Sequence, residues 1–329
     1  MKALITGGAG FIGNHLARHL LERGYRVDIA DSFLRGAHDA EIAALAASEE
    51  VRLLHVDLLQ ANALDDADSD YDCIFHFAAI VGVAHVLERP QAVLRDNVAM
   101  LTHALDFARN QTRLQRFVFP STSEVYAGTL EHFGLELPTP ESTPLALPDL
   151  ARPRTSYMLS KIYGEALCQH AGLPFTILRP HNVYGPRMGL SHVVPELLER
   201  AHKARENDVL EVFSIDHRRT FCYVDDAVAM FAQAAEAAEC EGETLNLGTE
   251  GPEITIGELA AIVVDVVGNP LHIVPGPETQ GSAPRRCPDM SRTIRLTGYR
   301  PHVALRDGVE RTYAWYRANV FDAGGVYTR

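Results

Sequence analysis

The chain has 329 residues, of which 47% are hydrophobic and 22% charged, so its composition is that of a folded globular protein and not of a disordered one. The formal net charge is −13 at pH 7 and the sequence contains no block of lysine or arginine, so we expect neither nucleic acid nor an anionic membrane as a partner. No apolar run reaches the ~20 residues that a transmembrane helix needs.

The cysteines are odd in number and scattered, without a CxxC pair, which is typical of reduced thiols in a cytoplasm. They are Cys73, Cys168, Cys222, Cys240 and Cys287. We interpret them as small buried hydrophobic residues, and we expect no metal site. The first apolar run begins at residue 3, so we expect no signal peptide and a cytoplasmic location.

A glycine-rich turn, Thr6-Gly-Gly-Ala-Gly-Phe-Ile-Gly13, separates the first apolar run from an amphipathic segment, residues 14–23. Gly7 can take the unusual dihedrals of such a turn, Gly10 lets the backbone approach a pyrophosphate, and Gly13 lets the helix pack closely on its strand. Phosphates then bind free N–H groups at the helix N-terminus.

A second apolar run, residues 26–30, ends at Asp31, where a ribose-binding acid is expected in a dinucleotide site. An acid at that position favours NAD over NADP. The alternative is a tight turn followed by a solvated carboxylate, but the strand, helix, strand context favours dinucleotide binding.

Apolar runs recur through the first half of the chain, and a helix-like or turn-rich segment follows each of them. The runs are Ala3–Ile5, Val27–Ala30, Val51–His55, Cys73–Ala78, Phe117–Pro120 and Phe175–Leu178. This alternation indicates an α/β protein with a doubly wound parallel sheet of the Rossmann type. We predict an NAD-binding domain over residues 1–178, completed by about residues 220–250.

After Arg179 this rhythm changes, and a smaller mixed C-terminal substrate domain is predicted over residues 179–219 and 251–329. The segment from Gly128 to Arg154 is rich in proline and lacks periodicity, so we interpret it as a surface loop beside the substrate. Helices are predicted at Arg95–Arg109, Ser156–His170, Val194–Arg205 and Ile256–Val267.

Tyr157 and Lys161 are four residues apart on a predicted helix, so their side chains share one face, one turn apart. A tyrosine with a pKa of ~10 is a poor base at neutral pH, but a neighbouring ammonium favours the phenolate. The tyrosine then becomes a candidate proton acceptor for a hydroxyl group. Taken alone, this spacing occurs by chance on many helices.

Several ordered motifs resolve this ambiguity, because together they resemble the extended short-chain dehydrogenase/reductase family over essentially the whole chain. Besides the glycine turn and the Tyr-Lys pair, they are Asp57-Leu58, His76-Phe-Ala-Ala79, Ser121-Thr-Ser-Glu-Val-Tyr126, Arg179-Pro-His-Asn-Val-Tyr-Gly-Pro-Arg187 and Arg219-Thr-Phe-Cys-Tyr-Val-Asp-Asp226. The resemblance is to the nucleotide-sugar epimerases, dehydratases and decarboxylases of that family. It implies a tightly held NAD, a transient 4-keto sugar and a homodimer formed through paired helices.

The resemblance also implies roles for individual residues. Thr122 matches the catalytic Ser/Thr, Tyr157 the base, and Lys161 the residue that orients the ribose and lowers the tyrosine pKa. The implied cofactor-binding residues are Gly7, Gly10, Phe11, Ile12, Gly13, Asp31, Asp57, Leu58, Phe77, Ala78, Ala79, Tyr157, Lys161 and Pro180. The implied substrate-binding residues are Ser123, Asn182 and Arg219, with Arg285 and Arg286 as a second diphosphate contact or else as surface ion pairs.

The departures from the family pattern bear on the reaction. Glu124 matches the acid of the dehydratases and decarboxylases, whereas Ser123 stands where one dehydratase class has an Asp, and His181 replaces an aromatic residue. We favour an NAD-dependent nucleotide-sugar epimerase acting at C4. The alternatives are a 4,6-dehydratase or a uronate decarboxylase that uses Glu124, and a non-catalytic NAD-binding protein.

Overall fold

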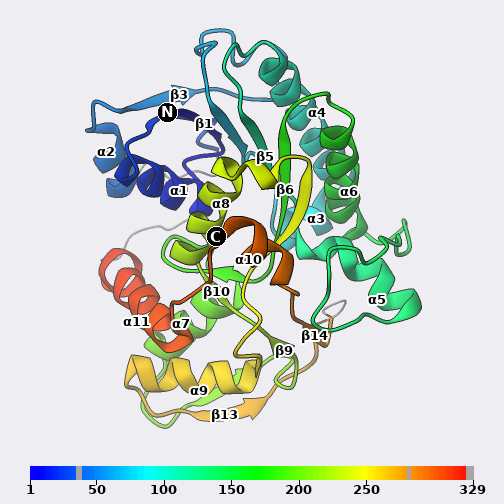
Figure 1. Cartoon of the computed structure of the whole chain (residues 1–329). Coiled ribbons are helices and arrows are strands. Elements are labelled where there is room, and N and C mark those ends of the chain that lie inside the picture. Colours follow the sequence, from blue (N-terminus) through cyan, green and yellow to red (C-terminus); the bar gives the residue numbers. More distant parts are fainter. Residues whose placement is uncertain (35–38, 280–282, 324–329) are drawn as a thin grey trace.

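The computed structural model describes residues 1–34, 39–279 and 283–323. Its centre is a seven-stranded parallel sheet with the strand order β11-β6-β5-β4-β1-β2-β3, in the upper part of Figure 1. The strands are β1 (Lys2–Thr6), β2 (Arg26–Asp31), β3 (Val51–His55), β4 (Cys73–His76), β5 (Arg116–Pro120), β6 (Phe175–Pro180) and β11 (Glu243–Leu247). The order reverses between β1 and β4, which is the switch point where open α/β sheets bind ligands.

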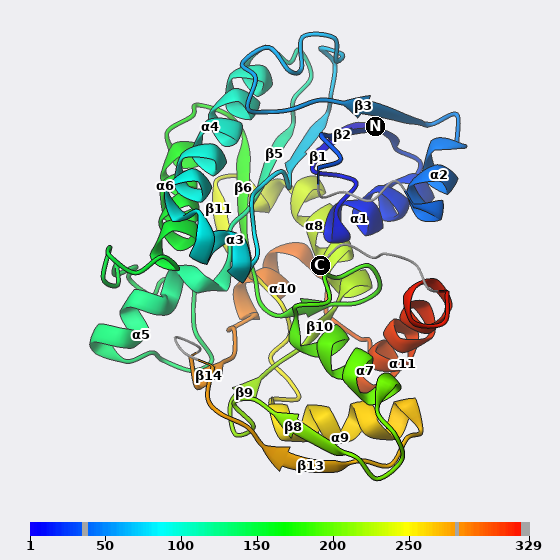
Figure 2. The same cartoon turned by 180° about the vertical axis from the view of Figure 1, so that it is seen from behind.

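Helices cover both faces of the sheet, and each face has its own apolar core (Figures 1 and 2). Successive strand residues point to opposite faces, so Ile5 joins the core under α1 and α8, whereas Leu4 joins the core under α4 and α6. The helices that flank the sheet are α1 (Phe11–Glu22), α2 (Ala40–Ala46), α3 (Val83–Glu88), α4 (Pro90–Arg109), α6 (Thr155–Gln169) and α8 (Val224–Glu236).

A smaller mixed region lies beyond the carboxyl ends of the strands, in the lower part of Figure 1. Its helices are α7 (Val193–Lys203), α9 (Ile256–Val267) and α11 (Leu305–Tyr316), the last followed by a π-helical turn, Arg317–Phe321, whereas α10 (Ser291–Thr297) packs against β11 and α8. Its short strands pair as β7 (Val183–Tyr184) with β10 (Cys222–Tyr223), β8 (Val209–Val212) with β13 (His272–Pro275), and β9 (Arg218–Arg219) between β12 (Ile254–Thr255) and β14 (Arg285–Arg286).

The predicted fold class is confirmed, and all six predicted strands are present with end shifts of at most two residues. The expectation of a continuous loop from Gly128 to Arg154 is wrong at its start, because α5 (Ala127–Phe133) is helical there. Gly128 packs against a later part of the same segment, where an added Cβ would lie 1.9 Å from the carbonyl oxygen of Ala146. The helix was not predicted because it is packed by residues distant in sequence, and such a contact produces no periodic pattern in the chain.

The cysteines are all buried and free, in line with their interpretation as small core residues. Across residues 1–34, 39–279 and 283–323, every helix is too short or too polar to span a bilayer. Within the same ranges, His, Cys, Asp and Glu side chains form no group of three or more that could hold a metal ion.

Candidate functional site

The glycine-rich turn after β1 has the backbone shape of a dinucleotide site. Gly7 has a φ of +70°, and an added Cβ would lie 2.6 Å from the amide nitrogen of Ala78. At Gly13 an added Cβ would lie 2.7 Å from the carbonyl oxygen of Gly7. Both positions therefore exclude side chains, and the first turn of α1, with Phe11 and Ile12, offers its N–H groups to phosphate.

Asp31 ends β2 beside this turn. Its Oδ2 accepts the Ala9 N–H at 3.0 Å, and its Oδ1 accepts the Phe33 N–H at 2.8 Å. Each carboxylate oxygen has a further lone pair, so Asp31 can also accept hydrogen bonds from ribose hydroxyls. This arrangement fits NAD, because the same carboxylate would repel the 2′-phosphate of NADP.

The remaining predicted cofactor residues follow, or end, three strands of the sheet, β3, β4 and β6. Asp57 follows β3 and accepts the Leu59 N–H at 3.0 Å, while Leu58 is buried. Phe77 follows β4 and packs edge-on against Phe231, with ring centroids 4.9 Å apart. Ala78 and Ala79 come next in the chain, and Pro180 ends β6. The structure therefore brings these residues to the side of the sheet where the carboxyl ends of the strands lie.

Tyr157 and Lys161 lie one turn apart on α6, and the Lys161 Nζ is 6.0 Å from the centroid of the Tyr157 ring. The same ammonium donates to the carbonyl oxygen of Pro120 at 2.7 Å. Burial lowers the pKa of Lys161 to about 8. The ammonium is thus held close to the phenol, where its positive charge favours the phenolate.

Thr122 follows β5, and its hydroxyl oxygen accepts the Glu124 N–H at 3.2 Å at the start of the short 3-10 helix Ser123–Tyr126. The Glu124 carboxylate is partly buried and lies 3.8 Å from Nη2 of Arg154, the residue before α6. Thr122 is two residues from Pro120, the acceptor of the Lys161 hydrogen bond. The four predicted catalytic residues therefore come from the facing ends of β5 and α6.

A buried polar network links these two elements. Ser121 Oγ donates to Glu165 Oε1 at 2.5 Å, and Arg179 of β6 binds the same carboxylate through Nε at 2.9 Å and Nη2 at 2.7 Å. Glu165 is one turn beyond Lys161 on α6, and Ser121 directly precedes Thr122. The network therefore joins the residue before Thr122 to the helix that carries Tyr157 and Lys161.

Paired arginines on β9 and β14 form the most basic part of the site. The two strands run parallel with Arg219 opposite Arg286 and Arg218 opposite Arg285. Burial, and after it the nearby charge of Arg286, lower the pKa of Arg219 to about 9. The Arg219 guanidinium also donates to the carbonyl oxygen of Arg218 at 2.7 Å through Nη1.

The other two arginines of these strands, Arg218 and Arg285, lie beside the carboxylate of Glu253. Arg285 is exposed and binds Glu253 through Nε at 2.6 Å and Nη2 at 2.7 Å. Of the two readings for Arg285, the geometry favours the surface ion pair. Arg286 instead lines a small pocket of about 20 Å³ together with Ser123 and His181.

His181 and Asn182 lie in the turn after β6. His181 is fully packed, with its Nε2 3.2 Å from Asn246 Oδ1, and burial lowers its pKa to about 3, so the ring is neutral. Asn182 has a φ of +41° and donates to the carbonyl oxygen of Thr220 at 3.0 Å, next to Arg219. Asn182 is thus joined to the segment that carries Arg219, whereas Ser123 shares a small pocket with Arg286.

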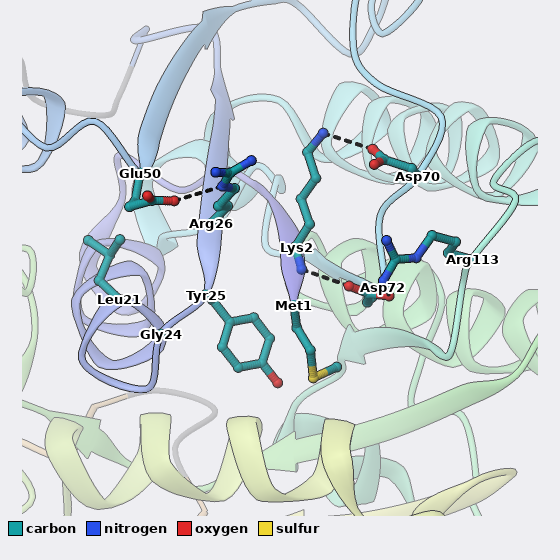
Figure 3. Close-up of a pocket in the computed structure, with 10 residues that line it drawn as sticks. All are labelled: Met1, Lys2, Leu21, Gly24, Tyr25, Arg26, Glu50, Asp70, Asp72 and Arg113. Atoms are coloured by element: carbon teal, nitrogen blue, oxygen red, sulfur yellow. Dashed lines mark hydrogen bonds and ion pairs between the residues drawn. The ribbon is translucent and has the colours of Figure 1, made fainter.

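A larger hollow of about 550 Å³ lies on the opposite side, at the amino ends of the strands (Figure 3). Its charged side chains pair with one another: Arg26 donates to Glu50 at 2.8 Å, and Lys2 to Asp70 at 2.8 Å. Parallel sheets bind ligands beyond the carboxyl ends of their strands. We therefore do not place the chemistry in this hollow.

Sequence reasoning assigned no role to Glu165, Arg154 or Arg187, although all three contact residues of the site. Glu165 could have been suspected from its position one turn after Lys161. The contact of Arg154 with Glu124 joins segments that are 30 residues apart and left no local signal.

Comparisons with known proteins agree with this geometry. Residues 3–248 match the model of the NAD dependent epimerase/dehydratase family. The chain is 30% identical to the UDP-N-acetyl-alpha-D-glucosaminuronate decarboxylase of Bacillus cytotoxicus, over 96% of this chain and 98% of that protein.

Solved structures give the same result. The UDP-glucose 4-epimerase of Thermotoga maritima superposes with a TM-score of 0.82 at 26% identity, covering 97% of this chain and 100% of that one. The dTDP-glucose 4,6-dehydratase of Streptomyces venezuelae, crystallised with NAD, also has a TM-score of 0.82, at 29% identity, over 97% and 98% of the two chains. The relatives found are extended short-chain dehydrogenases/reductases that act on nucleotide sugars. The chain therefore belongs to the NAD-dependent epimerase/dehydratase family.

Proposed function

We propose that the protein is an NAD-dependent nucleotide-sugar epimerase that inverts the configuration at C4. The glycine-rich turn and Asp31 would hold NAD, which would supply a reversible hydride acceptor for C4 of the sugar. The observation that supports this reaction best is the arrangement around β5 and α6. There Lys161 lies beside the Tyr157 ring and bonds the carbonyl oxygen of Pro120, two residues before Thr122, while the Glu124 carboxylate has Arg154 as its neighbour.

In this proposal the proton chemistry needs a single acid/base group. The Thr122 hydroxyl orients the C4 hydroxyl of the sugar, and the Tyr157 phenolate accepts its proton as the hydride leaves. Lys161 stays protonated below its pKa of about 8 and so keeps the phenolate accessible near neutral pH. The proton returns from Tyr157 in the reverse step, so the reaction is redox-neutral.

In this proposal the protein binds the substrate mainly through its diphosphate. Arg219 and Arg286 are the proposed diphosphate contacts, with Asn182 beside them, and Ser123 is the proposed sugar contact. This assignment places the substrate between the sheet and residues 179–219 and 251–329, which we propose as the substrate domain. We further propose a cytoplasmic homodimer formed through α4 and α6; a monomer mass by light scattering at micromolar concentration would contradict the dimer.

Glu124 favours a second candidate, a decarboxylase or a 4,6-dehydratase. Both share the first oxidation with the epimerase, and then need chemistry beside C5 of the 4-keto sugar. The Glu124 carboxylate lies two residues after Thr122, and the Bacillus cytotoxicus relative is named as a decarboxylase. In that case Glu124 would act on substrate, and its contact with Arg154 would have to open.

Product analysis separates these reactions. The purified protein is incubated with a panel of UDP- and dTDP-linked hexoses and uronic acids, and the products are identified by mass spectrometry and chromatography. A new isomer of unchanged mass supports the epimerase, whereas loss of water or of carbon dioxide supports the second candidate.

Substitution of Glu124 tests the same point independently. Glu124→Gln should retain substantial turnover in an epimerase and abolish product formation in a dehydratase or decarboxylase. Glu131→Gln is the control, because Glu131 is likewise a carboxylate beside an arginine, 2.8 Å from the guanidinium of Arg152, and it has no proposed role.

A further inference from the structure

Arg187 has no role in the chemistry above, although it is buried beside the glycine-rich turn. It follows β7 through Gly185 and Pro186, and only 2% of its side chain is exposed. A guanidinium is charged at every physiological pH, so its burial is costly unless it is paired and hydrogen-bonded. The partners of Arg187 therefore indicate what the residue does.

These partners come from two parts of the cofactor domain. Nε and Nη2 of Arg187 both lie 2.8 Å from Oδ2 of Asp39. Nη1 donates to the carbonyl oxygen of Gly10 at 3.4 Å, and Nη2 to that of Ala9 at 3.3 Å. One side chain thus joins the residue before α2 to two carbonyl groups of the glycine-rich turn.

The hydrogen bonds to carbonyl groups also orient the N–H groups of the turn. In a planar trans peptide, the carbonyl and the following N–H point in opposite directions. The bond from Arg187 to the Gly10 carbonyl therefore directs the Phe11 N–H away from the guanidinium. Phe11 is the first residue of α1, and the N–H groups of that turn are the donors that bind a dinucleotide pyrophosphate.

Both ends of this interaction are fixed. Asp39 caps α2, with its Oδ1 accepting the Ile42 N–H at 3.0 Å. On the other side, His15 of α1 has its Nε2 3.0 Å from the carbonyl oxygen of Pro186. An added Cβ on Gly185 would lie 2.6 Å from Val224 Cγ1, so the segment that precedes Arg187 sits directly on α8. The guanidinium cannot drift from the turn without moving these elements.

We propose that Arg187 is a cofactor-positioning residue that holds the glycine-rich turn in the form that binds the diphosphate of NAD. The guanidinium adds positive charge behind the turn, and Asp39 offsets part of it. Because Arg187 belongs to the segment that leads into the substrate region, that region contributes to NAD retention. The inference depends on NAD as the cofactor and not on which sugar reaction follows.

The test is NAD affinity. Arg187→Met keeps the length of the side chain and removes its charge and hydrogen bonds. Protein stripped of nucleotide should bind NAD about ten- to a hundredfold more weakly in this variant by calorimetry, and less NAD should remain bound after gel filtration. Arg306→Met is the control, because Arg306 is an exposed arginine of α11 paired with Asp265 and Glu310, and its loss should leave NAD affinity unchanged.

Ligand fragments separate this role from a general effect on folding. ADP, which contains a diphosphate, should lose affinity in parallel with NAD, whereas adenosine should bind wild type and variant equally. Arg187→Lys keeps the charge but cannot reach all three acceptors, so its NAD affinity should lie between those of wild type and Arg187→Met. The proposal is overturned if either variant binds NAD as wild type does, or if adenosine affinity falls as much as NAD affinity.

Discussion

Replacing Glu165 by Gln should lower the free energy of unfolding by about 3–5 kcal/mol, because it leaves a buried guanidinium without its counter-charge. The side chains of Glu165 and Arg179 are only 5% and 6% exposed, and the carboxylate accepts two hydrogen bonds from the arginine and one from Ser121. Glutamine keeps the shape of the side chain, so the loss measures charge and hydrogen bonding and not a cavity.

The chain contains a matched control for this prediction. Glu253 and Arg285 form the same two-point contact, at 2.6 and 2.7 Å, but the arginine side chain is 49% exposed. Glu253→Gln should therefore cost at most about 1 kcal/mol. Both variants are unfolded in urea at the same saturating NAD concentration, because bound ligand shifts apparent stability. Equal stability of Glu165→Gln and Glu253→Gln would refute the reasoning that burial makes the first pair critical.

Three further predictions concern the reaction, the cofactor and the effect of pH. Tyr157→Phe should lower kcat by about 10²–10⁴-fold with unchanged NAD content, and near wild-type turnover would exclude Tyr157 as the base. Nucleotide extracted from purified protein should be NAD, and recovery mainly of NADP would contradict the role of Asp31. Burial lowers the pKa of His15 to about 4 and of His76 and His181 to about 3, so the unfolded state binds more protons than the folded state below pH ~6.5. Stability should therefore fall by roughly 3 kcal/mol from pH 6 to pH 5 in urea titrations, and a flat profile would show that these rings are protonated in the fold.

Local patterns were sufficient to predict where the contiguous motifs of the candidate site lie in the fold. The glycine-rich turn, Asp31 and the Tyr157-Lys161 pair each occupy a strand end or one helix face, so their spacing in the chain determines their spacing in the fold. The predicted order of strands and helices follows from the same alternation. Of the seven strands of the central sheet, β11 was not predicted, because the segments before it no longer alternate and its pairing with β6 joins residues more than 60 positions apart.

Contacts between distant segments could not be predicted in this way. Arg285 and Arg286 are neighbours in sequence, yet only pairing of β14 with β9 places Arg286 opposite Arg219 and leaves Arg285 to Glu253. Likewise, the hydrogen bonds of Arg187 to the glycine-rich turn span more than 170 residues. Such contacts depend on the assembled fold and leave no periodicity in the chain.

Reaction in D2O tests the proposed C4 epimerisation most directly. With the nucleotide sugar that the product screen identifies, the hydride moves only between C4 and NAD, and Tyr157 exchanges protons only with a hydroxyl group. The account therefore predicts a product of unchanged mass, inverted at C4, with no deuterium on any carbon by NMR. Deuterium at C5 of the product would contradict it, because that result requires a base beside C5, the role that a dehydratase or decarboxylase would give to Glu124.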